Sequence, residues 1–274
     1  MTRALVLGGG GTTGIAWECG VLDALCAGGV DVGAADRVIG TSAGAIVGAF
    51  LGLGVTPSEL ATTWLDHIKT IGHLNAAVIA RLVAGQLGLD REATIRRYGR
   101  GGLVTSGLSE DAFVRAISEH LLGRPWPANL VVTTVNAATE RPALYDAGSG
   151  VDLGLAVAAS CAVPGVFPPV HIGGAPHLDG GVRTPANIDL AAGSDRVIAL
   201  APFHLSRDRA RRPAMQLAGL PAATRWLYAR PDRTASRAIG LDALDAARCR
   251  QARDAGRRQG RSALDAARRV WGAD

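Results

Sequence analysis

A serine between two glycines is the first candidate for chemistry in this chain. Ser42 stands in the sequence Gly40-Thr41-Ser42-Ala43-Gly44, after the strand-like run 37–39 and before a run of small and apolar residues. A serine in a sharp strand-to-helix turn exposes its hydroxyl, and side chains at the flanking glycine positions would collide with the strand or the helix. The start of the following helix also favours negative charge beside the serine. The pattern predicts a nucleophile elbow, although an ordinary strand-to-helix turn can carry the same letters.

A glycine-rich loop follows the first expected strand. Its spacing fits G-x-G-x-x-G, which in dinucleotide-binding enzymes is accompanied by an acidic residue at the end of the second strand. Here that strand ends in the Ser42 elbow instead. The other interpretation is an oxyanion hole, because consecutive glycines leave backbone N–H groups unobstructed for an anion. We prefer the oxyanion hole, which uses both motifs at one sheet edge, and keep dinucleotide binding as the alternative. The loop residues are Gly9, Gly10, Gly11 and Gly14.

A nucleophilic serine needs a base, and Asp179 is the candidate. It begins an Asp-Gly-Gly sequence at the exit of an expected hairpin, where backbone can approach a carboxylate closely. An aspartate beside glycine also forms ordinary Asx turns. His171, His177 and His204 are rivals that would give a Ser-Asp-His order along the chain. An α/β-hydrolase elbow normally follows several strands, however, and this one follows a single strand and helix.

Taken together, these motifs resemble bacterial patatin-like phospholipases. The resemblance rests on residues 9–14, 40–44 and 179–181, supported by the segment 159–169, and order and spacing agree over residues 4 to about 200. It implies a three-layer α/β/α fold with a central, mostly parallel sheet. It also implies a Ser42–Asp179 dyad without histidine, metal or other cofactor, acting on lipid acyl esters as a phospholipase A, lysophospholipase or other carboxylic ester hydrolase.

The chain departs from this family at one position. The family's oxyanion loop usually carries Arg or Lys where this chain has Thr13. The loss of that cation makes ester hydrolysis in general a safer expectation than a preference for phospholipids. It also keeps open a non-catalytic lipid-binding or regulatory protein on the same fold.

The remaining patterns predict the elements that position these motifs. A strand, a glycine loop, a helix and a second strand imply a parallel α/β sheet. Residues 56–127 are expected to be a helical insertion, with a capping box at 56–59 and a helix capped by Ser109 that runs to Leu122. Within it, residues 85–107 are either a mobile lid or a surface excursion. The other expected elements are strands at 130–136, 141–145 (an edge strand, because of its proline), 171–172, 177–178 and 196–200, and helices at 15–27 and 153–162.

Composition limits the class of protein. The 274 residues are 48% hydrophobic with 36 glycines, which suits a globular fold with a large core. No apolar run is long enough to span a membrane, and the N-terminus lacks the pattern of a signal peptide, so we expect a cytoplasmic protein. The four cysteines form no C-x-x-C pair, so no metal site is expected.

Positive charge is concentrated at the C-terminus. Residues 1–204, the expected catalytic domain, carry 13 basic against 17 acidic residues, whereas residues 205–274 carry 16 against 7. This C-terminal region is expected to be a helical extension packed on the domain. Its apolar stripe, which includes Leu264 and Trp271, would then either pack on the body or lie on an anionic membrane surface. We expect no nucleic-acid partner, because no reading motif or stacking aromatic residue accompanies the arginines.

Overall fold

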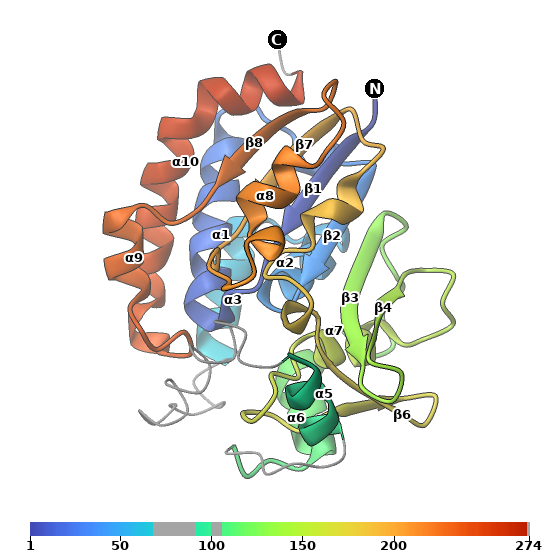
Figure 1. Cartoon of the computed structure of the whole chain (residues 1–274). Coiled ribbons are helices and arrows are strands. Elements are labelled where there is room, and N and C mark those ends of the chain that lie inside the picture. The colour runs from blue at the N-terminus through green and yellow to red at the C-terminus, as the bar shows by residue number, and fades with distance from the viewer. Residues whose placement is uncertain (68–90, 100–105, 273–274) are drawn as a thin grey trace.

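A central β-sheet covered on both faces forms the protein (Figure 1). The computed structural model describes residues 1–67, 91–99 and 106–272. The strands are β1 (Arg3–Leu7), β2 (Arg37–Thr41), β3 (Leu130–Asn136), β4 (Arg141–Tyr145), β5 (Val170–Ile172), β6 (Ala175–Asp179), β7 (Arg196–Leu200) and β8 (Arg225–Ala229). The helices are α1 (Gly11–Ala27), α2 (Ala43–Gly52), α3 (Pro57–His67), α5 (Arg91–Gly99), α6 (Glu110–Ser118), α7 (Leu153–Ser160), α8 (Pro213–Ala218), α9 (Arg233–Ile239) and α10 (Cys249–Trp271).

Parallel pairing runs through the centre of this sheet. The strand order is β5-β6-β3-β2-β1-β7-β8, and the pairs β3–β2, β2–β1, β1–β7 and β7–β8 are all parallel. The loops that follow β1, β2, β7 and β8 therefore open on one edge of the sheet, where sites form in α/β proteins. The expected mostly parallel sheet is confirmed. Among the described strands, β4 with its proline pairs only with β3, as expected of an edge strand.

The pairing of β3 decides where β6 lies. β4 pairs with residues 132–136 of β3, so it occupies one edge of that strand. β2 pairs with residues 130–133 and β6 with residues 134–136, so both must share the other edge. β6 is antiparallel and lies end to end with β2 along β3. Thr41, the last residue of β2, is opposite Thr133, and Asp179 is opposite the next residue, Thr134. This register brings the end of β6 to the serine that follows β2.

Alternate residues of the central strands face two different layers. Leu5 and Leu7 of β1 pack into a core formed with α1, α2, α7 and α10. Ala4 and Val6 of the same strand pack on the opposite face against α8 and a short 3₁₀ helix, Ile188–Ala191. This alternation follows the two-residue period of a β-strand. The three-layer arrangement expected from the family resemblance is confirmed.

The C-terminal region is part of these layers. Residues 225–229, expected to lie in a helical extension, form strand β8, which pairs in parallel with β7. Helix α10 packs along α1 (Figure 1), and a Cβ built on Gly256 would lie 2.3 Å from the carbonyl oxygen of Trp17, so the two backbones are in close contact. Trp271 is 1% exposed, and its indole N–H donates to the Asp31 carbonyl. The apolar stripe of this helix therefore packs on the body and is not free to enter a membrane.

Helix boundaries follow local signals in some places and tertiary contacts in others. The capping box is present, because the Thr56 N–H donates to Glu59 and the Glu59 N–H donates to the Thr56 hydroxyl. Ser109 caps α6 as expected, but the helix ends at Ser118 and the chain continues in turns rather than in helix to Leu122. The hairpin of β5 and β6 turns at two glycines, so β6 is longer than the expected 177–178.

Two further expectations concern a lid and membrane-spanning helices. The expected lid at 85–107 is described only in part: residues 91–99 form α5, whereas residues 85–90 and 100–105 lie outside the described residues. Among the helices in the described ranges, none combines the length and the apolar character needed to cross a bilayer.

Candidate active site

Ser42 sits in a strained turn between β2 and α2. Its backbone has φ 53° and ψ −118°, a conformation that side-chain-bearing residues rarely adopt. A Cβ added to Gly44 would lie 2.1 Å from the carbonyl oxygen of Leu7, and one added to Gly40 would lie 2.5 Å from the Cα of Ala45. Both glycines are therefore required by the close approach of neighbouring backbone. The elbow geometry predicted from the sequence is present.

Asp179 lies beside this serine at the end of β6. Both side chains are largely buried, with exposed fractions of 5% for Asp179 and 8% for Ser42. The Asp179 carboxylate accepts a hydrogen bond from the Gly181 N–H at 2.7 Å and interacts with the Ser42 hydroxyl. The aspartate N–H donates to the Ala162 carbonyl at 2.9 Å, which fixes its backbone. The carboxylate is thus held by its own turn and directed toward the serine.

Burial changes the acidity of Asp179. Desolvation raises its pKa to about 6, and the hydrogen bonds from Ser42 and Gly181 oppose this shift without cancelling it. An aspartate with an ordinary pKa of about 3.9 is a weak base at neutral pH. A carboxylate that holds its proton up to about pH 6 is better matched to proton transfer near neutrality.

The glycine loop lies next to the serine and is joined to the elbow. The Gly44 N–H donates to the Gly8 carbonyl at 3.0 Å, and a Cβ built on Gly9 would lie 3.6 Å from the Cβ of Ser42. The loop's N–H groups differ in their partners: that of Gly9 donates to the Pro185 carbonyl and that of Gly14 to the Gly10 carbonyl.

Two donors of this loop stay available. Within the described part of the chain, the N–H groups of Gly10 and Gly11 donate to no acceptor. Both stand at the start of α1, where the helix leaves its first N–H groups without internal partners. They are the loop's candidates for binding an oxyanion.

Comparison with known proteins agrees with this geometry. The profile of the patatin-like phospholipase family matches residues 5–192, which include the glycine loop, the elbow and Asp179. The chain belongs to the patatin-like phospholipase family. Three mycobacterial relatives, one from Mycobacterium bovis and two from strains of Mycobacterium tuberculosis, are 31% identical over 199 residues. Each is described as an uncharacterized NTE family protein, and the match covers 72% of this chain but only 29% of each relative.

Two solved structures align over almost the whole of this chain. VipD from Legionella pneumophila aligns over 97% of this chain and 67% of its own, with 16% identity and a TM-score of 0.46. The type III effector ExoU aligns over 97% of this chain and 53% of its own, with 20% identity and a TM-score of 0.48.

In this patatin-like chain, Thr13 has a structural partner. The residue is fully buried, and both its N–H and its hydroxyl donate to the carbonyl oxygen of Ala243, at 3.0 and 3.3 Å. Ala243 belongs to the C-terminal region, in the loop between α9 and α10. The position at which the family usually carries a cation is therefore used here to tie the glycine loop to the C-terminal region. Thr13 lies in the first turn of α1, which begins at Gly11, four residues before the expected start.

Two buried residues that sequence reasoning missed hold the site together. The Ser160 hydroxyl accepts from the Ser42 N–H at 2.8 Å and donates to the Thr133 carbonyl at 2.7 Å. The Asn187 amide, in a left-handed backbone conformation, donates to the hydroxyl of Thr41 at 3.0 Å and to the Gly180 carbonyl at 3.3 Å. Their only signal in the sequence is a polar residue within an otherwise apolar or small-residue segment.

The three rival histidines lie away from the serine, and two of them have other side-chain partners. His171 pairs with Glu110 at 2.7 Å, and His177 hydrogen-bonds to the Tyr145 hydroxyl at 2.7 Å. His204 lines a separate cavity at the end of β7. In the described ranges, no three His, Cys, Asp or Glu side chains come together as a set of metal ligands. The residues next to Ser42 therefore provide one carboxylate and backbone donors.

Proposed function

We propose that this protein is a lipid acyl hydrolase that cleaves carboxylic esters through an acyl-enzyme on Ser42. The observation that carries the proposal is a serine in a strained elbow beside a buried aspartate whose pKa is raised to about 6. Strained serines of this kind expose the hydroxyl for attack. Family membership supports a lipid ester as substrate.

The mechanism assigns one role to each group. The Ser42 hydroxyl oxygen attacks the ester carbonyl carbon while Asp179 accepts its proton. The N–H groups of Gly10 and Gly11 bind the negative oxygen that forms, and each such donor is worth about 2.7–4 kcal/mol in enzymes of known mechanism. The tetrahedral intermediate collapses, and the departing alcohol takes the proton from Asp179. Water then attacks the acyl-enzyme while Asp179 accepts its proton, and a second tetrahedral intermediate forms. When it collapses, the bond from the Ser42 oxygen to the acyl carbon breaks, Asp179 returns the proton to that oxygen, and the fatty acid is released.

Fluorophosphonate labelling tests this proposal directly. We expect covalent modification at Ser42, mapped by mass spectrometry, and no labelling of Ser42→Ala. We also expect hydrolysis of p-nitrophenyl esters, with turnover that increases with acyl length and is absent in Asp179→Asn. Ser262→Ala is a matched control, because this exposed serine lies on α10. Without labelling of the folded protein, the hydrolase proposal fails and a lipid-binding or regulatory role takes its place.

The cellular location belongs to the same proposal. We propose a cytoplasmic protein with peripheral contact to lipid. Because the apolar stripe of α10 is buried, such contact would be electrostatic, through exposed arginines of the C-terminal region. A sedimentation assay with anionic and neutral vesicles tests it, and equal binding to both would contradict it.

A further inference from the structure

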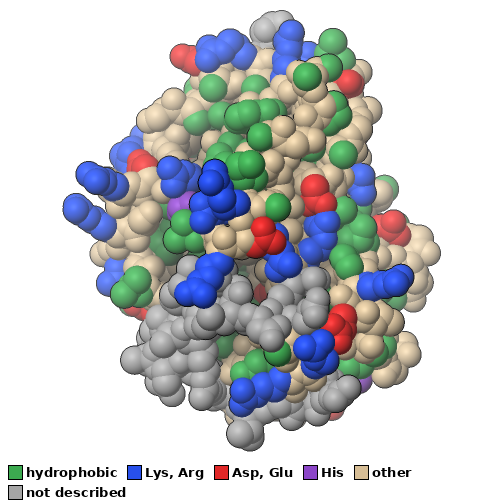
Figure 2. Space-filling view, in the orientation of Figure 1, with side chains coloured by type: hydrophobic (Ala, Val, Ile, Leu, Met, Phe, Trp, Pro, Cys, Tyr) green, Lys and Arg blue, Asp and Glu red, His purple; other side chains and the backbone are tan. Residues whose placement is uncertain are grey.

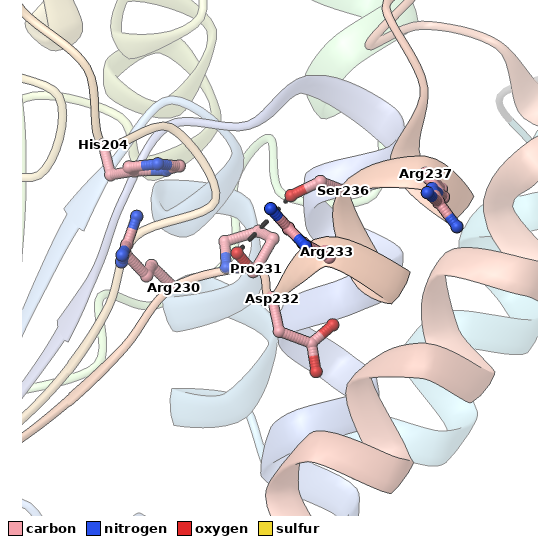
Figure 3. A pocket seen from close by; sticks show the side chains of 7 residues that line it. All are labelled: His204, Arg230, Pro231, Asp232, Arg233, Ser236 and Arg237. Atoms are coloured by element: carbon pink, nitrogen blue, oxygen red, sulfur yellow. Dashed lines mark hydrogen bonds between the residues drawn. The ribbon is translucent and has the colours of Figure 1, made fainter.

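A cavity opens at the edge of the sheet on which Ser42 lies. It has a volume of about 830 Å³ and lies where β7 and β8 end (Figure 3). We call it the arginine cavity, because three of its seven lining residues are arginines. The lining residues are His204, Arg230, Pro231, Asp232, Arg233, Ser236 and Arg237. Neither the family motifs nor the mechanism above uses any of these side chains.

The sheet order places this cavity close to the glycine loop. β1 lies between β2 and β7, and β8 follows β7, all in parallel. Neighbouring strands are about 4.8 Å apart, so the end of β7 is roughly 10 Å from the end of β2. The Phe203 N–H, one residue before His204, donates to the Gly9 carbonyl at 3.1 Å. The segment that lines the cavity is thus hydrogen-bonded to the expected oxyanion loop.

The charge of the cavity is strongly positive. Arg230 follows β8, and Arg233 and Arg237 come from α9; all three are exposed. None of the three forms an ion pair within the described residues. The one acid, Asp232, points away from His204 toward α10 in Figure 3, where both of its oxygens accept from Arg258 at 3.0 and 2.9 Å. Its charge is therefore already neutralised.

The surface around the cavity is also rich in positive charge. Figure 2 shows Lys and Arg side chains gathered over α9 and the adjoining loops. Guanidinium groups bind phosphate through paired N–H donors. The Ser236 hydroxyl donates to the Pro231 carbonyl at 3.4 Å, so the arginines are the cavity's donors for an anion. A cavity of about 830 Å³ lies within the range of small-molecule sites.

We infer that the arginine cavity binds a phosphate group, which the lipid substrate carries in its head group. The phosphate would lie among Arg230, Arg233 and Arg237. The binding site itself does not depend on hydrolysis, whereas its assignment to the substrate rests on the proposed function.

Direct binding is the first arm of the test. Isothermal titration calorimetry with sn-glycerol 3-phosphate, inorganic phosphate and glycerol would be run on three proteins: wild type, the triple variant Arg230→Gln/Arg233→Gln/Arg237→Gln, and a control, Arg250→Gln/Arg261→Gln/Arg269→Gln. The control removes three exposed arginines of α10 and the same net charge. We expect wild type and control to bind glycerol 3-phosphate, the cavity variant to bind at least about tenfold more weakly, and glycerol not to bind.

Kinetics are the second arm. Monomeric diheptanoyl phosphatidic acid and the neutral ester p-nitrophenyl butyrate would be compared at the same salt concentration. We expect kcat/KM for the phosphatidic acid to fall at least about tenfold in the cavity variant only, with the neutral ester unchanged in all three proteins.

Each failure has its own meaning. If glycerol 3-phosphate does not bind, or if the control loses as much affinity as the cavity variant, the phosphate site is overturned. Inorganic phosphate binding as tightly as glycerol 3-phosphate, with unchanged phosphatidic acid kinetics, supports a free-phosphate site and overturns its assignment to the substrate. Binding that depends on the arginines in a protein that hydrolyses no ester supports the site and refutes the hydrolase proposal instead.

Discussion

Replacing Asp179 by asparagine is expected to abolish turnover and, above neutral pH, to make the protein more stable. Burial raises the pKa of this carboxyl to about 6, whereas an aspartate in an unfolded chain has a pKa of about 3.9. The ionised form is therefore disfavoured in the fold by about two pKa units, or ~3 kcal/mol. Asparagine removes the charge, keeps the volume and still offers an oxygen to the Gly181 N–H.

The sign follows from proton linkage. Because its pKa is raised in the fold, Asp179 binds its proton more tightly in the folded state than in the unfolded state. Its contribution to stability is complete below about pH 4 and is lost as the pH rises through about 6. The variant should therefore exceed wild type in free energy of unfolding by ~3 kcal/mol at pH 8 and by about half of that at pH 5.

Urea unfolding followed by circular dichroism at these two pH values measures the effect. In thermal unfolding the same difference at pH 8 corresponds to about 6–12 °C for a chain of this size. Asp265→Asn is the matched control, because it makes the same chemical change at a side chain that is 84% exposed. If the difference in free energy of unfolding between the variant and wild type is the same at pH 5 and pH 8, then ionisation of Asp179 does not destabilise the folded protein, and the reasoning is refuted.

Three further predictions concern the site and its support. The kcat/KM for p-nitrophenyl butyrate should rise about tenfold per pH unit up to pH ~6 and then level, because only ionised Asp179 accepts the proton. A pH profile without this inflection would exclude Asp179 as the base. Ser160→Ala should lower the free energy of unfolding by about 1–3 kcal/mol in urea unfolding, because the buried Ser42 N–H loses its acceptor. The same loss should slow fluorophosphonate labelling, and labelling at the wild-type rate would contradict this. Trp271→Ala should cost about 3–5 kcal/mol in the same unfolding assay, because the ring is 1% exposed; an unchanged midpoint would mean that the end of α10 does not pack on the body in solution.

Local motifs made the central part of the fold predictable. The elbow at 40–44 and the capping box at 56–59 are each specified within a few residues, since glycine steric requirements and side-chain caps act over that range. The alternation of apolar residues in the strands follows the same local rule. The parallel sheet and family membership, both expected from these motifs, are confirmed. The catalytic roles of Ser42 and Asp179 stay predictions.

The elements that were missed depend on distant partners. Residues 225–229 pair with β7, and nothing in their own letters distinguishes that strand from a turn of helix. The apolar stripe of α10 fits a membrane surface as well as a protein surface until α1 is placed beside it. A lone serine such as Ser160 gives no signal that its hydroxyl holds the backbone of the nucleophile.

The amino-acid order alone sets which chemical groups this protein has and the local turns that carry them. A strained serine, a run of glycines and an Asp-Gly-Gly turn are defined by steric rules between near neighbours. The position of Asp179 beside Ser42 depends instead on tertiary contacts, because it requires β2 and β6 to share one edge of β3. The same packing removes the carboxylate from water and so raises its pKa to about 6. Proximity and desolvation arise from residues more than a hundred positions apart in the chain, which local sequence patterns do not encode.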